Sequence, residues 1–303
     1  MEPHRLKSRE FTAREDGPRL LITGAIHGDE FEPMAASRRL IAMFDSDEQL
    51  LERGSLQIVP VVNEAAFLRG HRVAEEDGLD LARICPGKAD GSITERTAYT
   101  FSQLIQQADN FIDLHTGGTE LSVWPLAGYK LHPNLDVRER ARRMAMAFNL
   151  PLVWATDAKM DGRSLSVARD ANVPAIYAEY FGSAIMRPDG VEAYVEGCLN
   201  VMGLLGMIDR EQPPNLVEHV IADERPEAGF MQICNPSPIT GFFEPVVAPG
   251  DIVEAGQLLG TVCNLLGDER REILAENSGL VVVLRTFPRV REGETLGVVA
   301  EIV

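Results

Sequence analysis

The 303-residue sequence contains no run approaching the ~20 consecutive apolar residues that a transmembrane helix requires. Its first twenty residues are rich in charge and lack the apolar segment that characterises a secretory signal peptide. We therefore expect a soluble, cytoplasmic protein that has no membrane as partner.

Cysteine is scarce, and its four positions are scattered without any Cys-x-x-Cys pair: Cys85, Cys198, Cys234 and Cys263. Disulfide frameworks are typical of short secreted domains, so we expect ordinary buried thiols in this chain. No internal repeat, low-complexity tract or sustained heptad is apparent.

Basic residues are outnumbered, because 29 Lys and Arg face 46 Asp and Glu, which gives a formal charge of −17. This balance argues against a nucleic-acid backbone or an anionic membrane as the main partner. It does not exclude a small anionic substrate, which responds only to its local pocket. The apolar fraction of 45% is sufficient for a core, and the length suggests about two domains.

Short apolar runs alternate with segments of helical period from about residue 19 to about residue 208. The expected strands are 19–26, 56–62, 111–114, 152–156 and 173–179, and the clearest helices are 34–44, 137–148 and 191–205. This alternation is typical of an α/β domain with a mostly parallel sheet. Chemistry in such sheets gathers at the carboxyl ends of the strands.

The residue pattern changes after Leu205, where the alternation of apolar runs and helical segments ends. Gln212-Pro213-Pro214 indicates a linker, and from Ile239 onward the apolar runs are short, β-branched and separated by turns. We expect no helix of any length there, which predicts a small all-β domain. The expected domains are therefore 1–210 and 211–303.

The segment Gly24-Ala-Ile-His27-Gly-Asp-Glu30 leaves a predicted strand and enters a predicted helix. Residues three apart on a helical turn share a face, so His27 and Glu30 can converge on one point. An imidazole and a carboxylate are ligands that Zn²⁺ accepts, and a third ligand must come from elsewhere. An isolated His-x-x-Glu pattern is more often a solvated turn.

A third ligand is available in Phe111-Ile-Asp113-Leu-His115, an apolar run that also ends in histidine. His115 is expected at the same edge of the sheet as His27, and together with the His-x-x-Glu pattern it favours a metal site. Asp113 would share its side of the strand with His115. It could orient a ligand or simply cap a turn.

Glu179 closes the apolar run that begins at Val173. A carboxylate in that position is costly unless it is exposed, paired or functional. Beside a metal it could take a proton from water, whose pKa the metal lowers to near 7. The alternative is an ordinary exposed glutamate at a strand end.

Three arginines, Arg69, Arg72 and Arg83, lie close together in this acidic chain. Asp80 could fix the guanidinium of Arg83 so that its fork faces the carboxylate of a ligand. The alternative is a surface loop with ordinary, weak salt bridges.

The order of four motifs resembles the succinylglutamate desuccinylase and aspartoacylase family of zinc carboxypeptidase-like hydrolases. The motifs are GAIHGDE, then NEAAF with EDGLDLAR, then IDLHTGG, then an apolar strand ending in Glu. The resemblance runs from about residue 19 to the C-terminus. It implies an α/β fold with a mixed sheet flanked by helices, followed by a C-terminal all-β domain that is barrel- or sandwich-like. That last stretch is similar to a biotinyl or lipoyl carrier domain but has no Met-Lys-Met for attachment.

The resemblance also implies a role for each matching residue. One Zn²⁺ per chain would be held by three ligands, namely His27, Glu30 and His115. Glu179 matches the catalytic carboxylate that acts as general base and then as acid. Arg72 falls where the family polarises the scissile carbonyl, and Arg83 matches the arginine that grips the substrate's carboxylate.

The implied activity is a zinc-dependent amidohydrolase, a deacylase that splits a small N-acyl amino acid into amino acid and carboxylate. This chain has Asp80-Leu81-Ala82-Arg83 where the family usually has Asp-Leu-Asn-Arg. The missing amide leaves the identity of the substrate open. Thr116-Gly117-Gly118 resembles members that act on N-acetylated diamino acids.

Two other functions stay open at this point, as does assembly into a homo-oligomer. One is a metallocarboxypeptidase that acts on peptides with the same metal and base but a longer groove. The other is a metal-containing binding protein that has lost its activity.

Overall fold

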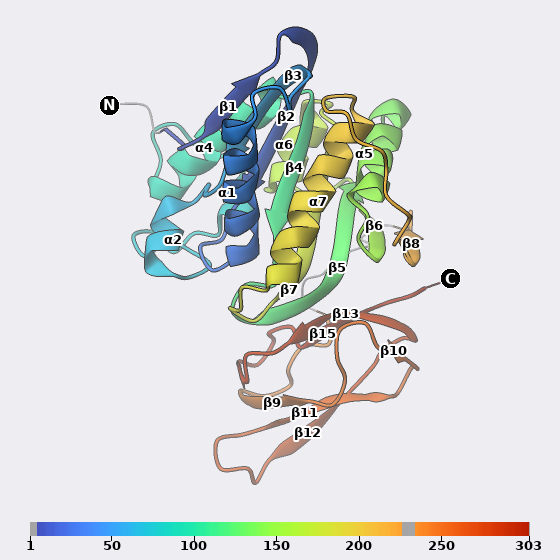
Figure 1. Cartoon of the computed structure of the whole chain (residues 1–303). Helices are drawn as coiled ribbons and strands as arrows, with labels where there is room; N and C mark the ends of the chain where they lie inside the picture. Colours follow the sequence, from blue (N-terminus) through green and yellow to red (C-terminus); the bar gives the residue numbers. More distant parts are fainter. Residues whose placement is uncertain (1–4, 226–233, 303) are drawn as a thin grey trace.

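The computed structural model describes residues 5–225 and 234–302. Figure 1 shows a sheet flanked by helices, with a smaller part built of strands at one end of it. The helices are α1 (Phe31–Ser46), α2 (Glu64–Arg69), α3 (Leu81–Ile84), α4 (Ile93–Gln107), α5 (Leu135–Phe148), α6 (Ser164–Asp170) and α7 (Pro188–Leu204). The strands up to the linker are β1 (Arg9–Thr12), β2 (Glu15–Gly24), β3 (Arg53–Val59), β4 (Asn110–His115), β5 (Leu121–Lys130), β6 (Leu152–Thr156) and β7 (Ala175–Gly182).

The central sheet is mixed, as the family resemblance implies. Strands β3, β2, β4 and β7 are neighbours and run parallel. Strand β5 runs antiparallel to β7 and parallel to β6. All five expected strands and the three expected helices are present with small shifts of their ends. Strand β5 was not singled out from the sequence, because Pro125 and Gly128 interrupt its apolar pattern.

Helices cover both faces of this sheet. Helices α1, α5 and α7 pack on one face, where Leu20 and Ile22 of β2 point. Helices α3, α4 and α6 pack on the other face, toward which Leu21 points. Successive side chains of a strand alternate between faces, so a strand buried on both sides is apolar throughout. The carboxyl ends of the strands are not covered by these helices, and polar residues gather there.

The expected all-β character of the C-terminal part is confirmed: beyond α7, the described residues contain no helix. Its strands are β8 (His219–Ala222), β9 (Gly241–Pro245), β10 (Ile252–Val253), β11 (Leu258–Cys263), β12 (Arg270–Leu274), β13 (Gly279–Arg285), β14 (Arg289–Val290) and β15 (Gly297–Ala300). Strands β12, β11, β9 and β14 form a separate four-stranded sheet. Strand β13 pairs with β5 and extends the central sheet, and the two sheets share a core that includes Phe243, Val262 and Val281.

Pairings between the two parts of the chain bear on its division. β8 pairs with β6 in the central sheet, and β13 pairs with β5. The expected boundary at residues 210 and 211 therefore stays a prediction.

No helix among the described residues is both long and apolar enough to cross a bilayer. All four cysteines are free thiols; Cys85 and Cys198 are buried, and the other two are half-buried.

Candidate metal and substrate site

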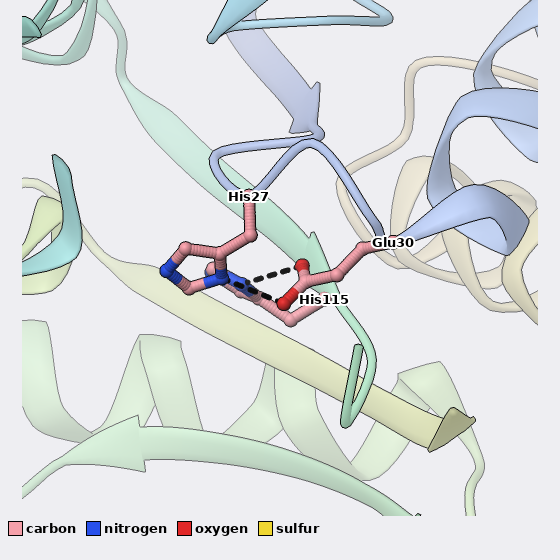
Figure 2. A group of neighbouring side chains, drawn as sticks. All are labelled: His27, Glu30 and His115. Carbon is pink, nitrogen blue, oxygen red and sulfur yellow. Dashed lines mark hydrogen bonds and ion pairs between the residues drawn. The ribbon is translucent and has the colours of Figure 1, made fainter. Parts of the chain in front are cut away.

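The residues expected to bind a metal come together at one edge of the sheet (Figure 2). His27 and Glu30 lie in the loop between β2 and α1, and His115 is the last residue of β4. His27 Nδ1 is 2.6 Å from Glu30 Oε1, and His115 Nδ1 is 3.1 Å from Glu30 Oε2. The expectation that His27 and Glu30 share a helical turn is wrong, because α1 begins only after Glu30. The loop itself brings them together.

The backbone of this loop is tightly constrained. Ala25 adopts a positive φ of 54°, which costs energy in a residue with a Cβ. The N–H of Gly28 donates to the carbonyl of His71 at 3.1 Å. A Cβ on Gly28 would lie 2.1 Å from the carbonyl carbon of Ala66, so only glycine fits against α2. These contacts constrain the backbone that carries His27 and Glu30.

The donor set has the chemistry of a zinc site. One ligand atom from each of His27, Glu30 and His115 lies within 4.8 Å of the other two. Two imidazoles and one carboxylate form a ligand set that leaves a catalytic zinc ion one open position. In the part of the chain that the structure describes, no other three His, Cys, Asp or Glu residues cluster in this way.

Each imidazole is oriented from behind by a second carboxylate. Nε2 of His27 is 3.2 Å from Asp80 Oδ1, and Nε2 of His115 is 3.1 Å from Asp113 Oδ2. These contacts occupy the Nε2 atoms and leave both Nδ1 atoms facing Glu30. Carboxylate partners of this kind fix the ring orientation and tautomer of metal-binding histidines. Of the two sequence interpretations of Asp113, the structure supports the one in which it orients a ligand.

The charges of the site reinforce this arrangement. Burial alone would raise the pKa of Glu30, but His27 and His115 beside it lower the pKa to about 2, so the carboxylate is ionised. Burial alone would lower the pKa of His115, but Asp113 and Glu30 raise it well above its ordinary value. A proton and a metal ion compete for the same imidazole nitrogen of His115. The negative charges of Asp113 and Glu30, which favour the proton there, therefore also favour a divalent cation.

Glu179 lies on β7 beside the candidate metal ligands, directly across the strand pair from His115. It is half-buried, and its Oε2 is shielded from solvent with no hydrogen-bond partner among the described residues. Burial and the charge of Glu30 raise its pKa to about 7, although His115 partly offsets this shift. Glu179 is thus not an ordinary exposed glutamate at a strand end. It can gain and lose a proton near neutral pH.

The expected pairing of Asp80 with Arg83 is wrong, because Asp80 binds Arg72 instead. Nε and Nη2 of Arg72 donate to Asp80 Oδ2 at 3.1 and 2.9 Å. Asp80 is the N-cap of α3, and its Oδ1 receives the N–H of Ala82. The same carboxylate contacts His27 and Arg72.

Arg83 has no ion-pair partner among residues 5–225 and 234–302; its guanidinium donates to the carbonyl of Ala82 at 2.8 Å. Burial lowers its pKa to about 10. A guanidinium without a carboxylate partner can bind the carboxylate of a ligand. Arg69 donates to the carbonyls of Val73 and Ala74 and is not among the residues that line the cavity.

One cavity of about 830 Å³ connects these groups. It is lined by all six residues selected from the sequence as site residues: His27, Glu30, Arg72, Arg83, His115 and Glu179. It is also lined by residues that sequence reasoning missed, among them Glu120, Lys130, Arg163, Arg285, Phe287 and Arg289. Arg285 closes an apolar strand just as Glu179 does, so the same signal could have identified it. The others follow no local pattern.

The C-terminal part forms one wall of the cavity and is held there by ion pairs. Arg285 is buried, and its Nη2 lies 3.3 Å from Glu120 Oε2 and 3.2 Å from Glu294 Oε2. Arg289 lies 3.0 Å from Glu120. The backbone N–H of Phe287 also donates to the carbonyl of Glu120. Because Glu120 lies in the loop that follows His115, its contacts join the C-terminal wall to the edge that carries the candidate metal ligands.

The chain is similar to known proteins of one family. Residues 16–205 match the succinylglutamate desuccinylase/aspartoacylase catalytic domain. An N-alpha-acetyl-L-2,4-diaminobutyric acid deacetylase of Halomonas elongata is 31% identical over 298 residues, which cover 96% of this chain and 84% of that protein.

Two solved structures extend the comparison. The product-bound ectoine utilisation protein EutE (DoeB) of Ruegeria pomeroyi superposes with a TM-score of 0.85 at 27% identity, over 95% of this chain and 86% of that one. A succinylglutamate desuccinylase/aspartoacylase of Rhodobacter sphaeroides gives a TM-score of 0.87 at 23% identity, over 98% of this chain and 90% of that one. At that identity the second likeness shows the fold alone.

Proposed function

The chain belongs to the succinylglutamate desuccinylase/aspartoacylase family, and we propose that it is a zinc-dependent deacylase that hydrolyses the amide of a small N-acyl amino acid. The observation that carries the proposal is the convergence of His27 Nδ1, His115 Nδ1 and Glu30 in one cavity. Beside them lies Oε2 of Glu179, which has no hydrogen-bond partner among the residues that the structure describes. The proposal includes a cytoplasmic location.

His27, Glu30 and His115 would hold one Zn²⁺ per chain. A bound zinc ion supplies a Lewis acid that polarises the scissile carbonyl and lowers the pKa of water to near 7. Asp80 and Asp113 keep the two imidazoles turned so that each Nδ1 faces Glu30.

Glu179 is the general base and acid of the proposed reaction. Its Oε2 takes a proton from the attacking water and returns it to the nitrogen of the departing amine. Burial raises the pKa of the Glu179 carboxyl, and a catalytic group works best with a pKa close to the working pH.

Arg72 and Arg83 are proposed to act on two different oxygens of the substrate. Arg72 donates to the carbonyl oxygen as negative charge develops there, and Asp80 holds its guanidinium in place through two hydrogen bonds. Arg83 binds the α-carboxylate with its planar fork. Together they fix the amide between the metal ligands and Glu179.

The substrate to test first is N-α-acetyl-L-2,4-diaminobutyrate, because the Halomonas relative is named for it and Thr116-Gly117-Gly118 resembles members that act on N-acetylated diamino acids. Release of the free amine should require zinc. N-acetylaspartate, N-succinylglutamate and unmodified dipeptides are the comparison substrates. The C-terminal part forms one wall of the cavity, and for a deacylase of this kind dipeptides should react much more slowly. Faster turnover of dipeptides would indicate a metallocarboxypeptidase instead.

Glu179→Gln separates an enzyme from an inactive metal-binding protein. The amide has nearly the same shape as the carboxylate but cannot accept a proton, so turnover should fall by ~10²–10⁴-fold while zinc content and fold are kept. His27→Ala and His115→Ala should instead lose zinc, as measured by metal analysis. Near-normal kcat in zinc-loaded Glu179→Gln would show that another residue is the base.

A further inference from the structure

A buried lysine lies in the wall of the cavity at a distance in sequence from every residue assigned above. Lys130 is the last residue of β5 and is 5% exposed. Its Nζ donates to the carbonyls of Met160 at 2.7 Å and of Asp157 and Ala158 at 3.4 Å. A buried ammonium group is costly unless its donors are satisfied, and its three donors match these three acceptors.

All three carbonyls belong to the loop of residues 157–163, which connects β6 to α6. A second cation binds the same loop from the side of α6. Arg169 donates to the carbonyl of Ala158 and, at 2.8 Å, to Asp161 Oδ1. Two cationic side chains from outside the loop therefore hold it, and of these two only Lys130 lines the cavity.

The loop packs directly against the backbone of Arg83. The carbonyl of Gly162 accepts the N–H of Cys85 at 3.0 Å. Gly162 has a φ of +79°, and a Cβ there would lie 2.3 Å from the carbonyl oxygen of Arg83. A movement of this loop must therefore move α3, which carries Arg83.

The loop ends at the residues that support the metal ligands. Ser164 follows it and donates from its Oγ to Asp113 Oδ2 at 2.5 Å, and Asp113 in turn holds His115. Arg163, within the loop, lines the cavity. The residues whose carbonyls bind Lys130 are nearer in sequence to Gly162, which contacts Arg83, than to Ser164. Loss of Lys130 should therefore displace Arg83 more than it weakens metal binding.

We propose that Lys130 is a positioning residue for substrate binding, which fixes the 157–163 loop and through it holds Arg83 where the α-carboxylate of the substrate binds. This inference rests on the proposed function. It requires no contact between Lys130 and the substrate, because the ammonium group acts through the backbone carbonyls. Small displacements of a binding group are known to cost as much as ~10²-fold in rate.

The test is Lys130→Met, which keeps the length of the side chain and removes the ammonium group. For N-α-acetyl-L-2,4-diaminobutyrate we expect KM to rise about tenfold or more, with kcat and zinc content close to wild type. For N-acetyl-1,3-diaminopropane, which is the same molecule without its carboxylate, we expect KM to stay unchanged. Lys130→Arg keeps a cationic donor and should restore most of the affinity.

Lys159→Met is the matched control, because it makes the same substitution in the same loop at an exposed lysine without a described contact to the cavity. It should behave as wild type with both substrates. If Lys130→Met fails to fold, Arg169→Leu tests the same idea by removing the other cation that binds the loop. Its KM should then rise selectively for the substrate that carries the carboxylate.

Two outcomes overturn the inference while leaving the proposed function intact. One is an unchanged KM in folded Lys130→Met. The other is an equal loss for both substrates together with loss of zinc, which would make the lysine a general structural residue. An inactive, zinc-loaded wild type would overturn the proposed function and this inference with it.

Discussion

Asp113 offers the sharpest test of how this site orients its proposed metal ligands. It is fully buried on β4, two residues before His115. Its Oδ2 faces His115 Nε2 at 3.1 Å and receives the hydroxyl of Ser164, while its Oδ1 receives the hydroxyl of Thr23 at 2.8 Å. Asp113→Asn preserves the size of this side chain and removes its charge.

The expected loss can be worked out from these contacts. The asparagine oxygen can still face His115 and Ser164 if its amide nitrogen turns to Thr23, whose hydroxyl can accept as well as donate. The hydrogen bonds are then kept, and only the negative charge that makes His115 a strong ligand is lost. Changes to such supporting residues cost about 10–100-fold in metal affinity. This range corresponds to about 1.4–2.8 kcal/mol.

Zinc affinity should be measured by competition with a chromogenic chelator at fixed pH. Asp109→Asn is the control, because it makes the same substitution at a largely exposed carboxylate that receives the backbone N–H of Arg19. It should leave zinc affinity unchanged. Wild-type affinity in a folded Asp113→Asn protein would refute the idea that Asp113 orients His115 for metal binding.

Three further outcomes follow from the same contacts. Arg83→Lys should raise KM for N-acyl amino acids much more than for the matching amines, because a point charge replaces a fork; equal effects in a kinetic comparison would place the carboxylate elsewhere. Gly28→Ala should destabilise the fold by ~1–3 kcal/mol and reduce zinc loading, because its Cβ collides with Ala66; thermal unfolding and metal analysis together check this, and wild-type values would contradict it. Burial lowers the pKa of Lys130 from 10.5 to about 8, so between these pH values the unfolded chain binds more protons there and stability rises with pH. The free energy of unfolding of wild type relative to Lys130→Met should therefore increase by about 3 kcal/mol from pH 7 to pH 10.5 in denaturant titrations, and a constant difference would show that Lys130 is not buried as a cation.

Local patterns in the sequence were sufficient to indicate the candidate metal ligands and the family. His27, Glu30, His115 and Glu179 each follow an apolar run, and apolar runs report strands whatever lies around them. Parallel strands in one sheet end at a common edge, so the four side chains could be expected together without coordinates. The expected strands and helices of the α/β part were found for the same reason, since periodicity is a property of neighbouring residues.

The tertiary structure decided which atoms face each other. Asp80 binds His27 and Arg72 rather than Arg83, because the N-cap geometry of α3 turns its carboxylate toward the metal-binding loop. Nothing in a four-residue motif reports the direction of that turn. The pairing also joins residues 53 positions apart, and such contacts depend on how the elements pack.

The cavity walls were likewise beyond the reach of local pattern. Strand β13 adds to β5 across more than 150 residues of sequence, and only that pairing brings Arg285 beside Glu120. Lys130 has no motif either, since its partners are backbone carbonyls, which every residue carries. The sequence indicates a functional side chain where that residue directly follows an apolar strand in the chain. Contacts between residues that are far apart in the sequence depend on how the strands and helices pack.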